Sequence, residues 1–420
     1  MPQSIVQFSA QTINVNSTRL WESLMTMAQI GATEKGGCNR QALTDLDKQG
    51  RDLFVQWCNA IGCEILVDEI GNIFARRAGK NNALPAVITG SHLDTQPTGG
   101  KFDGVYGVLA GLEVLRTLHD HDIQTEHPIE VVVWTNEEGA RFPPACMGSG
   151  VWSGNFSLAD TYQITDKAGK TVGDELSRIG YQGSLKAKPR NIKAAFEAHI
   201  EQGPILEKQH KQIGIVTGIQ GLRWYELTLH GKPCHAGPTP MEDRIDPVQA
   251  MLKILQSCYD LAFENGPWAR ATVGDIQVLP GSPNTVPELM KVLIDIRHPK
   301  TEIIAAMAES FTEKVASVCQ SMAVDYQLKE AWRMKVTEFA PLCVDAVEAS
   351  VNLLGYSSMK MVSGAGHDSL YVAERVPTSM IFVPCEDGLS HNEAENAKQE
   401  DLAAGANVLL HAILTLAASE

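Results

Sequence analysis

The hydrophobic positions of the chain change their spacing at two points. Up to about residue 217, largely apolar runs such as Ala86–Gly90 and Ile129–Trp134 alternate with stretches of helical spacing such as residues 105–120. Short continuous apolar runs are typical of strands that are buried on both faces, and their alternation with helices indicates an α/β sheet of parallel character. The first half of the chain therefore predicts a large α/β domain.

Helix and turn signals support this interpretation near the N-terminus. A helix is expected over residues 20–30, where Asn16 can cap the first turn and Gly31 ends the pattern. A second helix is expected over Leu46–Ile61, and two short strands should follow, joined by the turn DEIGN.

After Gly218 the pattern becomes that of half-exposed strands and two long amphipathic helices. The expected elements are strands at 223–232, 271–280, 285–299 and 323–332, and helices at 246–264 and 301–322. Their order, β-α-β-β-α-β, is the ferredoxin-like arrangement.

Beyond residue 334 the first pattern returns. A helix is expected near Val344–Leu354, then a strand at 379–385 and a final helix at about 399–418. We therefore predict that residues 1–217 and 334–420 form one α/β domain with a mixed sheet, and that residues 218–333 form a ferredoxin-like domain inserted into it.

Composition narrows the classes of function. The formal net charge is −15 and the chain has no Lys/Arg run, so neither a nucleic acid nor an anionic membrane surface is an expected partner. No run of about 18 apolar residues and no signal peptide are evident, which argues against a membrane span or secretion. Nine cysteines without a CxxC pair predict reduced thiols in the cytoplasm.

Polar residues gather in five clusters at the expected strand ends or in the loops beside them. The clusters are SHLDT (91–95), KFDG (101–104), TNEEG (135–139), EAHIEQG (197–203) and LSHNEAE (389–395). In an open α/β sheet, loops at the carboxyl ends of the strands form the binding site. The clusters together offer His92, Asp94, Asp103, Glu137, Glu138, His199 and His391.

Each cluster alone has an ordinary explanation. A single histidine after a strand is usually a hydrogen-bonded loop residue, and a pair of glutamates is usually a solvated turn. Five such clusters together instead indicate a metal hydrolase, because imidazole and carboxylate ligands suit zinc or a similar divalent ion. Neighbouring Glu137 and Glu138 can serve one site if the strand ends near Trp134 and Gly139 permits a turn.

Longer motifs carry a family resemblance. They are GSHLDTQPTGGKFDGVYGVLAG, TNEEGARF, EAHIEQGPILE, HAGPTPMEDRIDP, PNTVPE followed by DIRHP, GAGHD and LSHNEAE. Together and in this order they resemble the hydantoinase/carbamoylase family of dinuclear-metal amidohydrolases, within the aminoacylase/carboxypeptidase superfamily. The resemblance extends from about Asn16 to the last helix. Members include N-carbamoyl-L-amino-acid hydrolases, β-ureidopropionases and allantoate amidohydrolases.

The resemblance implies two divalent metal ions. His92 and His199 match the ligands of one ion, Glu138 and His391 match those of the other, and Asp103 matches the carboxylate that bridges both. Zinc is the first expectation, and manganese, cobalt and nickel accept the same ligands.

The resemblance also implies a general base and a substrate site. Glu137 matches the base that moves a proton from water to the leaving nitrogen, and Asp94 matches the carboxylate that orients His92. His235 matches a residue that polarises the scissile carbonyl or stabilises the oxyanion. The matching substrate contacts are Gln202, His235, Asn284, Arg297 and Gly366.

Two of these substrate residues also have simpler interpretations. An arginine such as Arg297 often forms a surface ion pair, and Asn284 lies between prolines, as a turn residue would. In the family context, the guanidinium of Arg297 is expected to bind a substrate carboxylate bidentately.

The expected reaction is hydrolysis of an N-carbamoyl amino acid to the amino acid, ammonia and carbon dioxide. The segment GARFPPACMGSGVWSG is closer to carbamoylases and β-ureidopropionases than to allantoate hydrolases. The sequence leaves open whether the product is an α- or a β-amino acid. Alternatives are allantoate or ureidoglycine hydrolysis in purine catabolism, and an aminoacylase or peptidase. A non-enzymatic relic is disfavoured because no ligand or base is missing.

The resemblance further implies how the domains act. The inserted domain is expected to be a lid that also joins two chains in a homodimer. Its hinges are expected near Gly218–Gly221 and Lys335–Glu338.

Overall fold

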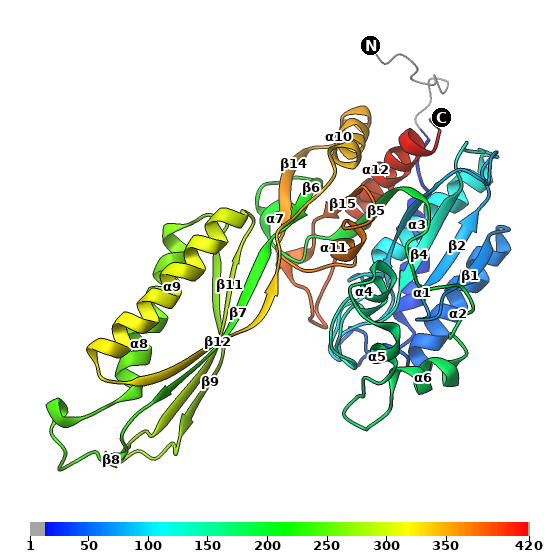
Figure 1. Ribbon diagram of the computed structural model, residues 1–420. Helices are drawn as coiled ribbons and strands as arrows, with labels where there is room; N and C mark the ends of the chain where they lie inside the picture. Colours follow the sequence, from blue (N-terminus) through cyan, green and yellow to red (C-terminus); the bar gives the residue numbers. More distant parts are fainter. Residues whose placement is uncertain (1–12, 419–420) are drawn as a thin grey trace. The chain divides into compact units, whose positions relative to one another are not determined.

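A computed structural model describes residues 13–418 (Figure 1). The chain forms two compact units. The larger unit comprises Met1–Gly218 and Glu338–Glu420, and the smaller unit comprises Ile219–Thr337.

The larger unit is built on a mixed sheet. Its strands follow the order β1-β2-β4-β3-β5-β15-β6, with β14 beside β6 and a two-residue strand β13 (Thr337–Glu338) paired to β6 where the chain passes between the units. The central strands β4, β3, β5 and β15 are parallel to their neighbours in this group, whereas β1, β2 and β6 are antiparallel to theirs. The bounds are β1 Glu64–Val67, β2 Ile73–Arg77, β3 Ala86–His92, β4 Ile129–Trp134, β5 Ile192–Ile200, β6 Ile213–Ile219, β14 Ser358–Ser363 and β15 Thr378–Val383. The predicted α/β class with a mixed sheet is confirmed.

Burial explains why the central strands were recognisable in the sequence. Every residue of β3, β4 and β15 is buried, which accounts for the largely apolar runs described above. The longer helices pack against one another and the sheet, with α3 on β3 and α12 on β15. Their bounds are α1 Ser17–Ala28, α2 Asp45–Ala60, α3 Val105–Asp120, α10 Pro341–Leu354 and α12 Gln399–Ala417.

Helix starts agree with their capping signals. The Asn16 side chain accepts a hydrogen bond from the N–H of Arg19 (3.0 Å), so the expected cap of α1 is confirmed. Helix α10 begins at Pro341, three residues before the expected start, because proline is well suited to the first helical turn.

Helix α12 is long and apolar enough, by length and composition, to cross a membrane, although its sequence contains no uninterrupted run of about 18 apolar residues. In the structure 78% of its apolar window is buried, as expected for a core helix.

Several short elements of the larger unit were not predicted. They are α4 (Met147–Ser153), α5 (Leu158–Tyr162), α6 (Val172–Ile179), α7 (Ile205–Lys208), α11 (Ser369–Val372), β6 and β14. The helices among them have eight residues or fewer, which is too short for helical periodicity to stand out.

The smaller unit has the β-α-β-β-α-β order expected from its spacing. Its antiparallel sheet has the order β12-β7-β11-β9, and α8 and α9 pack against it. The bounds are β7 Gly221–His230, α8 Pro247–Glu264, β9 Arg270–Leu279, β11 Leu289–His298, α9 Thr301–Ser321 and β12 Asp325–Met334.

One expected strand of the smaller unit is divided. The strand predicted at 285–299 separates into β10 (Thr285–Val286), which pairs with β8 (Cys234–His235), and β11. Pro287 lies at the break, where it has no N–H to donate to a ladder.

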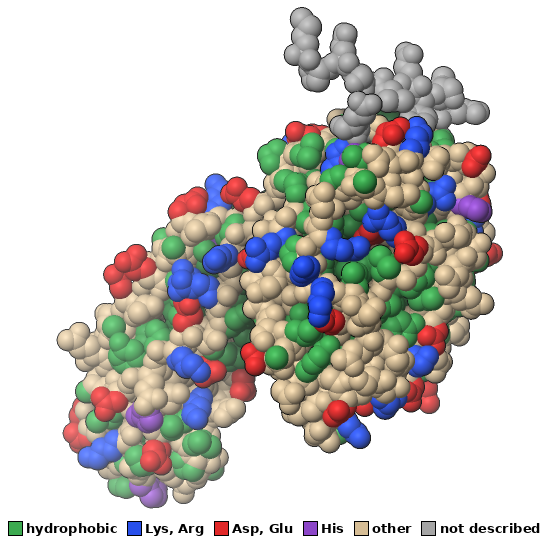
Figure 2. All heavy atoms as spheres, turned by 45° about the vertical axis from the view of Figure 1, so that its right-hand side comes forward, with side chains coloured by type: hydrophobic (Ala, Val, Ile, Leu, Met, Phe, Trp, Pro, Cys, Tyr) green, Lys and Arg blue, Asp and Glu red, His purple; other side chains and the backbone are tan. Residues whose placement is uncertain are grey.

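Figure 2 shows Lys and Arg side chains intermixed with acidic and apolar ones over the visible face of the molecule.

Candidate metal centre

The parallel strands bring the predicted ligands to one edge of the large sheet. His92 is the last residue of β3, His199 is the penultimate residue of β5, and Glu138 follows β4 by four residues. Asp103 directly precedes the Gly104 cap of α3, and His391 lies in the loop before α12. The structure therefore brings all five predicted metal ligands together in two overlapping groups of three.

The first group, here called the histidine group, comprises His92, Asp103 and His199. Nδ1 of His92 lies 2.9 Å from the Asp94 carbonyl oxygen, and Nδ1 of His199 lies 2.9 Å from that of Ile200. A carbonyl only accepts, so each Nδ1 is the donor and Nε2 is left for another partner. The Nε2 atoms lie 3.8 Å (His92) and 3.2 Å (His199) from Asp103 Oδ1.

The second group, here called the glutamate group, comprises Asp103, Glu138 and His391. Nε2 of His391 lies 3.3 Å from Asp103 Oδ2 and 3.2 Å from Glu138 Oε2. Asp103 thus presents one oxygen to each group, which is the arrangement of a bridging carboxylate. These imidazoles and carboxylates fit divalent metal ions, because the Nε2 atoms face carboxylate oxygens at distances that only a proton or a cation makes favourable.

The acidic side chains of the centre strongly affect one another. Burial works to raise the pKa of Asp103, but hydrogen bonds from His199 and His391 outweigh it and hold that pKa well below its ordinary value. Burial raises the pKa of Glu137 well above its ordinary value, and the nearby charges of Asp368 and Glu138 add to this effect. A bound cation would offset the same repulsion between carboxylates.

The backbone between β4 and α4 resolves how two adjacent glutamates reach one site. The strand ends at Trp134, as expected, and both Asn136 (φ 54°) and Gly139 (φ 62°) adopt positive φ angles. The chain therefore turns on either side of Glu137 and Glu138, and the expected turn at Gly139 is confirmed.

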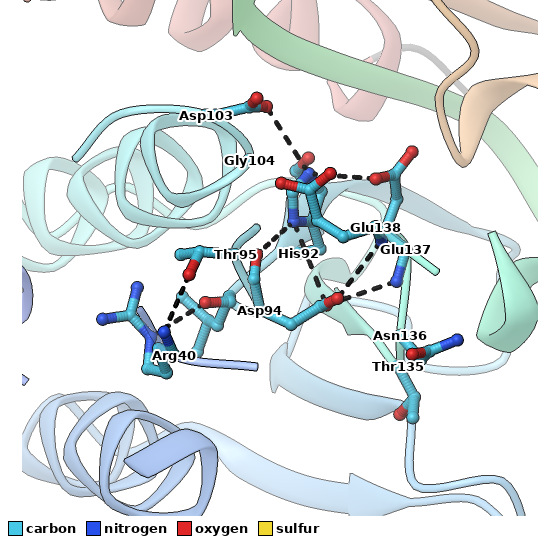
Figure 3. Close-up of polar contacts among 12 residues, drawn as sticks. Arg40, His92, Asp94, Thr95, Asp103, Gly104, Thr135, Asn136, Glu137 and Glu138 are labelled. Carbon is cyan, nitrogen blue, oxygen red and sulfur yellow. Dashed lines mark hydrogen bonds and ion pairs between the residues drawn. The ribbon is translucent and has the colours of Figure 1, made fainter. Parts of the chain in front are cut away.

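Asp94 holds this turn in place. Its Oδ1 accepts the N–H of Glu137 (3.2 Å) and its Oδ2 accepts the N–H of Glu138 (3.2 Å), as Figure 3 shows. The resemblance implied that the carboxylate of Asp94 orients His92. In the structure its main-chain carbonyl does so instead, and the nearer carboxylate oxygen is 3.9 Å from Nδ1 of His92.

The two glutamates have different surroundings. Among the described residues, Glu138 belongs to a candidate ligand group, whereas Glu137 lies beside the histidine group with Oε2 3.4 Å from His92 Nε2. Oε1 of Glu137 accepts a hydrogen bond from the thiol of Cys146 (3.3 Å). Glu137 is only 8% exposed, so its carboxylate is a desolvated group placed next to the candidate metal centre.

The predicted substrate contacts divide between the two units. Gln202 has a φ of 57° and donates to Asp103 Oδ2 (2.9 Å), which places it at the centre. Gly366 is exposed and directly precedes His367, whose ring centroid lies 4.6 Å from that of His199.

The other three predicted contacts belong to the smaller unit. His235 and Asn284 are exposed and lie at the β8–β10 pair, where the N–H of Ala236 donates to the Asn284 carbonyl oxygen (2.9 Å). Arg297 lies on β11 and donates to Asp295 through Nε (2.8 Å) and a terminal nitrogen (2.7 Å).

Three buried residues near the centre were not predicted from the sequence: Glu395, Glu197 and His367. Glu395 accepts the N–H groups of Phe102 (2.8 Å) and Asp103 (3.2 Å), so it positions the shared carboxylate. Glu197 accepts two serine hydroxyls at 2.6 Å and, with His199 and His367, forms a third group of potential ligands. All three lie inside quoted motifs, LSHNEAE, EAHIEQG and GAGHD, so a search of every acidic and imidazole side chain there would have found them.

Comparison with known proteins places this geometry in context. The pattern that defines Peptidase family M20/M25/M40 matches residues 88–415. The chain is 48% identical over 404 residues to the N-carbamoyl-L-amino-acid amidohydrolase of Rhizobium meliloti, covering 96% of this chain and 97% of that protein. It is 33% identical over 404 residues to the allantoate amidohydrolase of Escherichia coli, covering 94% and 97%.

A solved structure is also similar over nearly the whole length. The hydantoinase/carbamoylase family amidase of Burkholderia multivorans superposes with a TM-score of 0.95 at 51% identity, covering 97% of this chain and 100% of that one. The resemblance inferred from the sequence motifs is therefore confirmed.

Proposed function

This protein belongs to Peptidase family M20/M25/M40, and we propose that it hydrolyses the carbamoyl C–N bond of N-carbamoyl amino acids to give the amino acid, ammonia and carbon dioxide. The observation that carries this proposal is the pair of ligand groups sharing Asp103, with the buried carboxylate of Glu137 beside them. Two relatives named for this activity, 48% and 35% identical to this chain, support the choice of substrate class, whereas two named for allantoate are 32% and 33% identical.

We infer two divalent ions per chain, with zinc as the first expectation and manganese, cobalt or nickel as alternatives. His92 and His199 would hold one, Glu138 and His391 the other, and Asp103 would lie between them. When bound, such ions polarise a carbonyl and increase the acidity of water. A ureido carbonyl needs this help because two nitrogens donate electrons into it.

Glu137 is the proposed general base. Its Oε2 faces the histidine group, and the raised pKa of the carboxyl, caused first by burial, makes it a stronger base than an exposed glutamate. In this role Oε2 takes a proton from the attacking water and then delivers it to the leaving nitrogen. Asp94 supports both steps by fixing the backbone of Glu137 and Glu138.

The smaller unit would complete the substrate site. His235 would stabilise the developing oxyanion, and the guanidinium of Arg297 would bind the substrate carboxylate. Asn284, Gln202 and Gly366 would provide further contacts. In this proposal residues 218–333 act as a lid that brings these side chains to the centre when substrate is bound.

We also propose a cytoplasmic homodimer joined through the smaller unit. Leu252, Tyr259 and Phe263 recur at helical spacing on α8 and are 64%, 39% and 85% exposed. Each of the nine cysteines is a free thiol, in keeping with a reducing compartment. Phe263→Glu should convert a dimer to a monomer, measured by light scattering, and a monomeric wild type would contradict the dimer.

Turnover of three substrates tests the proposed activity. The metal-loaded protein should release ammonia from N-carbamoyl-L-alanine or N-carbamoyl-β-alanine with a higher kcat/KM than from allantoate. Higher kcat/KM for allantoate would favour the alternative of an allantoate amidohydrolase. Inactivity on all three substrates with metal bound would contradict the carbamoyl hypothesis.

A further inference from the structure

Cys146 lies against the carboxylate that the proposed function uses as its base. We propose that Cys146 is a positioning residue, whose thiol holds one oxygen of Glu137 so that the other faces the metal centre. This inference rests on the proposed function, because it assigns Cys146 a role only through Glu137.

The two oxygens of Glu137 have separate partners. The thiol of Cys146 donates to Oε1 (Sγ–Oε1 3.3 Å), while Oε2 lies 3.4 Å from Nε2 of His92. Cys146 is 5% exposed and Glu137 is 8% exposed, so water competes weakly for Oε1. A carboxylate with one oxygen engaged in this way cannot rotate freely about its last torsion, which fixes the direction of Oε2.

The main chain of Cys146 is tied to the same residue. Its N–H donates to the carbonyl oxygen of Glu137 (2.7 Å), and the next two N–H groups, of Met147 and Gly148, donate to Asn136 (3.1 Å) and Thr135 (2.8 Å). The thiol and the carboxylate are therefore side chains of two segments joined by three backbone hydrogen bonds. Their relative position is a property of the fold rather than of two flexible side chains.

The backbone conformation of Cys146 supports a role for its side chain. The residue precedes α4 in the left-handed region, with φ 51° and ψ 38°. Glycine adopts this conformation without the clash that a Cβ atom causes, and asparagine tolerates it better than most residues. A cysteine at this position therefore carries a conformational cost, which is understandable if the thiol contributes to the site.

A thiol suits this task better than a more polar donor. Burial raises the pKa of the Cys146 thiol well above its ordinary value, so it remains an S–H donor and adds no negative charge beside Glu137. A thiol is also a weak donor, and it can orient a carboxylate without strongly reducing its basicity.

Three variants of Cys146 test the inference, with Cys58→Ala as a matched control. Cys58 is a fully buried thiol on α2 of the larger unit, outside the metal centre. Cys146→Ala and Cys146→Gly remove the donor, and glycine also removes the conformational cost, so a folding defect in the alanine variant leaves the glycine variant to decide. Cys146→Ser keeps a donor at the same position.

The expected result is a kcat roughly 10-fold lower for Cys146→Ala and Cys146→Gly, because a weak S–H donor supplies the lower end of the range for one hydrogen bond to a charged group. KM for N-carbamoyl-L-alanine and metal content should stay near wild type. Cys146→Ser should remain within about threefold of the wild-type kcat, and Cys58→Ala should equal wild type in kcat.

Three outcomes would overturn the inference. One is a kcat within twofold of wild type in both donorless variants. Another is a loss of metal that parallels the loss of kcat, which would indicate a structural role in building the centre. The third is a Cys146→Ser variant whose kcat is as low as that of Cys146→Ala. An inactive wild type would instead contradict the proposed function itself.

Discussion

Replacing Asp94 with asparagine should reduce turnover far more than stability. The Asp94 carboxylate is 2% exposed and accepts the N–H of Glu137 with one oxygen and that of Glu138 with the other. Asparagine offers one acceptor oxygen and an NH₂ group, so one of the two backbone N–H groups will meet a donor. The turn that places both glutamates then loses one of its two supports.

Two energy terms of similar size oppose each other in the stability of the metal-free protein. Burial raises the pKa of Asp94 from 3.8 to about 6, so the ionised carboxylate costs roughly 3 kcal/mol that a neutral amide avoids. Losing a hydrogen bond to a charged group costs about 1.5–3 kcal/mol. The free energy of unfolding should therefore change by about 1.5 kcal/mol or less.

Turnover has no such compensation. If the lost hydrogen bond lets the carboxylate of Glu137 move, the activation free energy should rise by about 1.5–3 kcal/mol. This corresponds to a kcat roughly 10- to 100-fold lower. The assay is ammonia release from N-carbamoyl-L-alanine, with urea unfolding of the metal-free protein at the same pH. Glu113→Gln is the control, because Glu113 is buried on α3 and accepts the N–H of Asn16 and the guanidinium of Arg19 outside the centre.

The control should lose stability and keep its kcat. An Asp94→Asn variant that keeps its kcat within twofold of wild type would refute the reasoning. So would a variant whose kcat falls only in proportion to its unfolded fraction.

Three other predictions concern the metal-free protein, the histidine group and the substrate. Hydrogen bonds to carboxylates raise the pKa of His391 to about 10, above roughly 6.5 in the unfolded chain, so its stabilisation is complete below pH 6.5 and is lost as pH rises toward 10. The Tm of metal-free protein should fall over that range, less steeply in His391→Ala; equal slopes would contradict this. Gly104→Ala should reduce bound metal to about half, measured by elemental analysis, because its Cβ would lie 2.3 Å from the ring of His92; full metal content would contradict the geometry. Arg297→Lys should raise KM roughly 10-fold, since an ammonium lacks the guanidinium fork, while an unchanged KM would argue against a carboxylate contact.

The sequence predicted the strands best where both faces are buried. Ile129–Trp134 is apolar except for the buried Glu130 because β4 has no solvent face, so its end, and the start of the polar site, could be placed to the residue. Helices such as α5 and α7 offered too few residues for a periodic pattern, and their positions depend on local caps and tertiary contacts.

The candidate ligands could be predicted because each belongs to a recognisable motif, either at the end of a strand or in a loop. The role of Asp94 could not be predicted, because it depends on the positive φ of Asn136, which turns two N–H groups toward one carboxylate. The contact between Cys146 and Glu137 likewise requires the chain to return to the centre nine residues later. Such contacts follow from three-dimensional closure of a loop, which residue spacing does not encode.

The metal-to-protein ratio of two variants, measured beside their turnover, tests the central claim most directly. The account predicts two ions per wild-type chain, one in Glu138→Ala, and two in Glu137→Gln with most of its turnover lost, because the amide cannot carry the proton. A Glu137→Gln protein that binds one ion, together with a Glu138→Ala protein that keeps two, would contradict the separate roles of ligand and base.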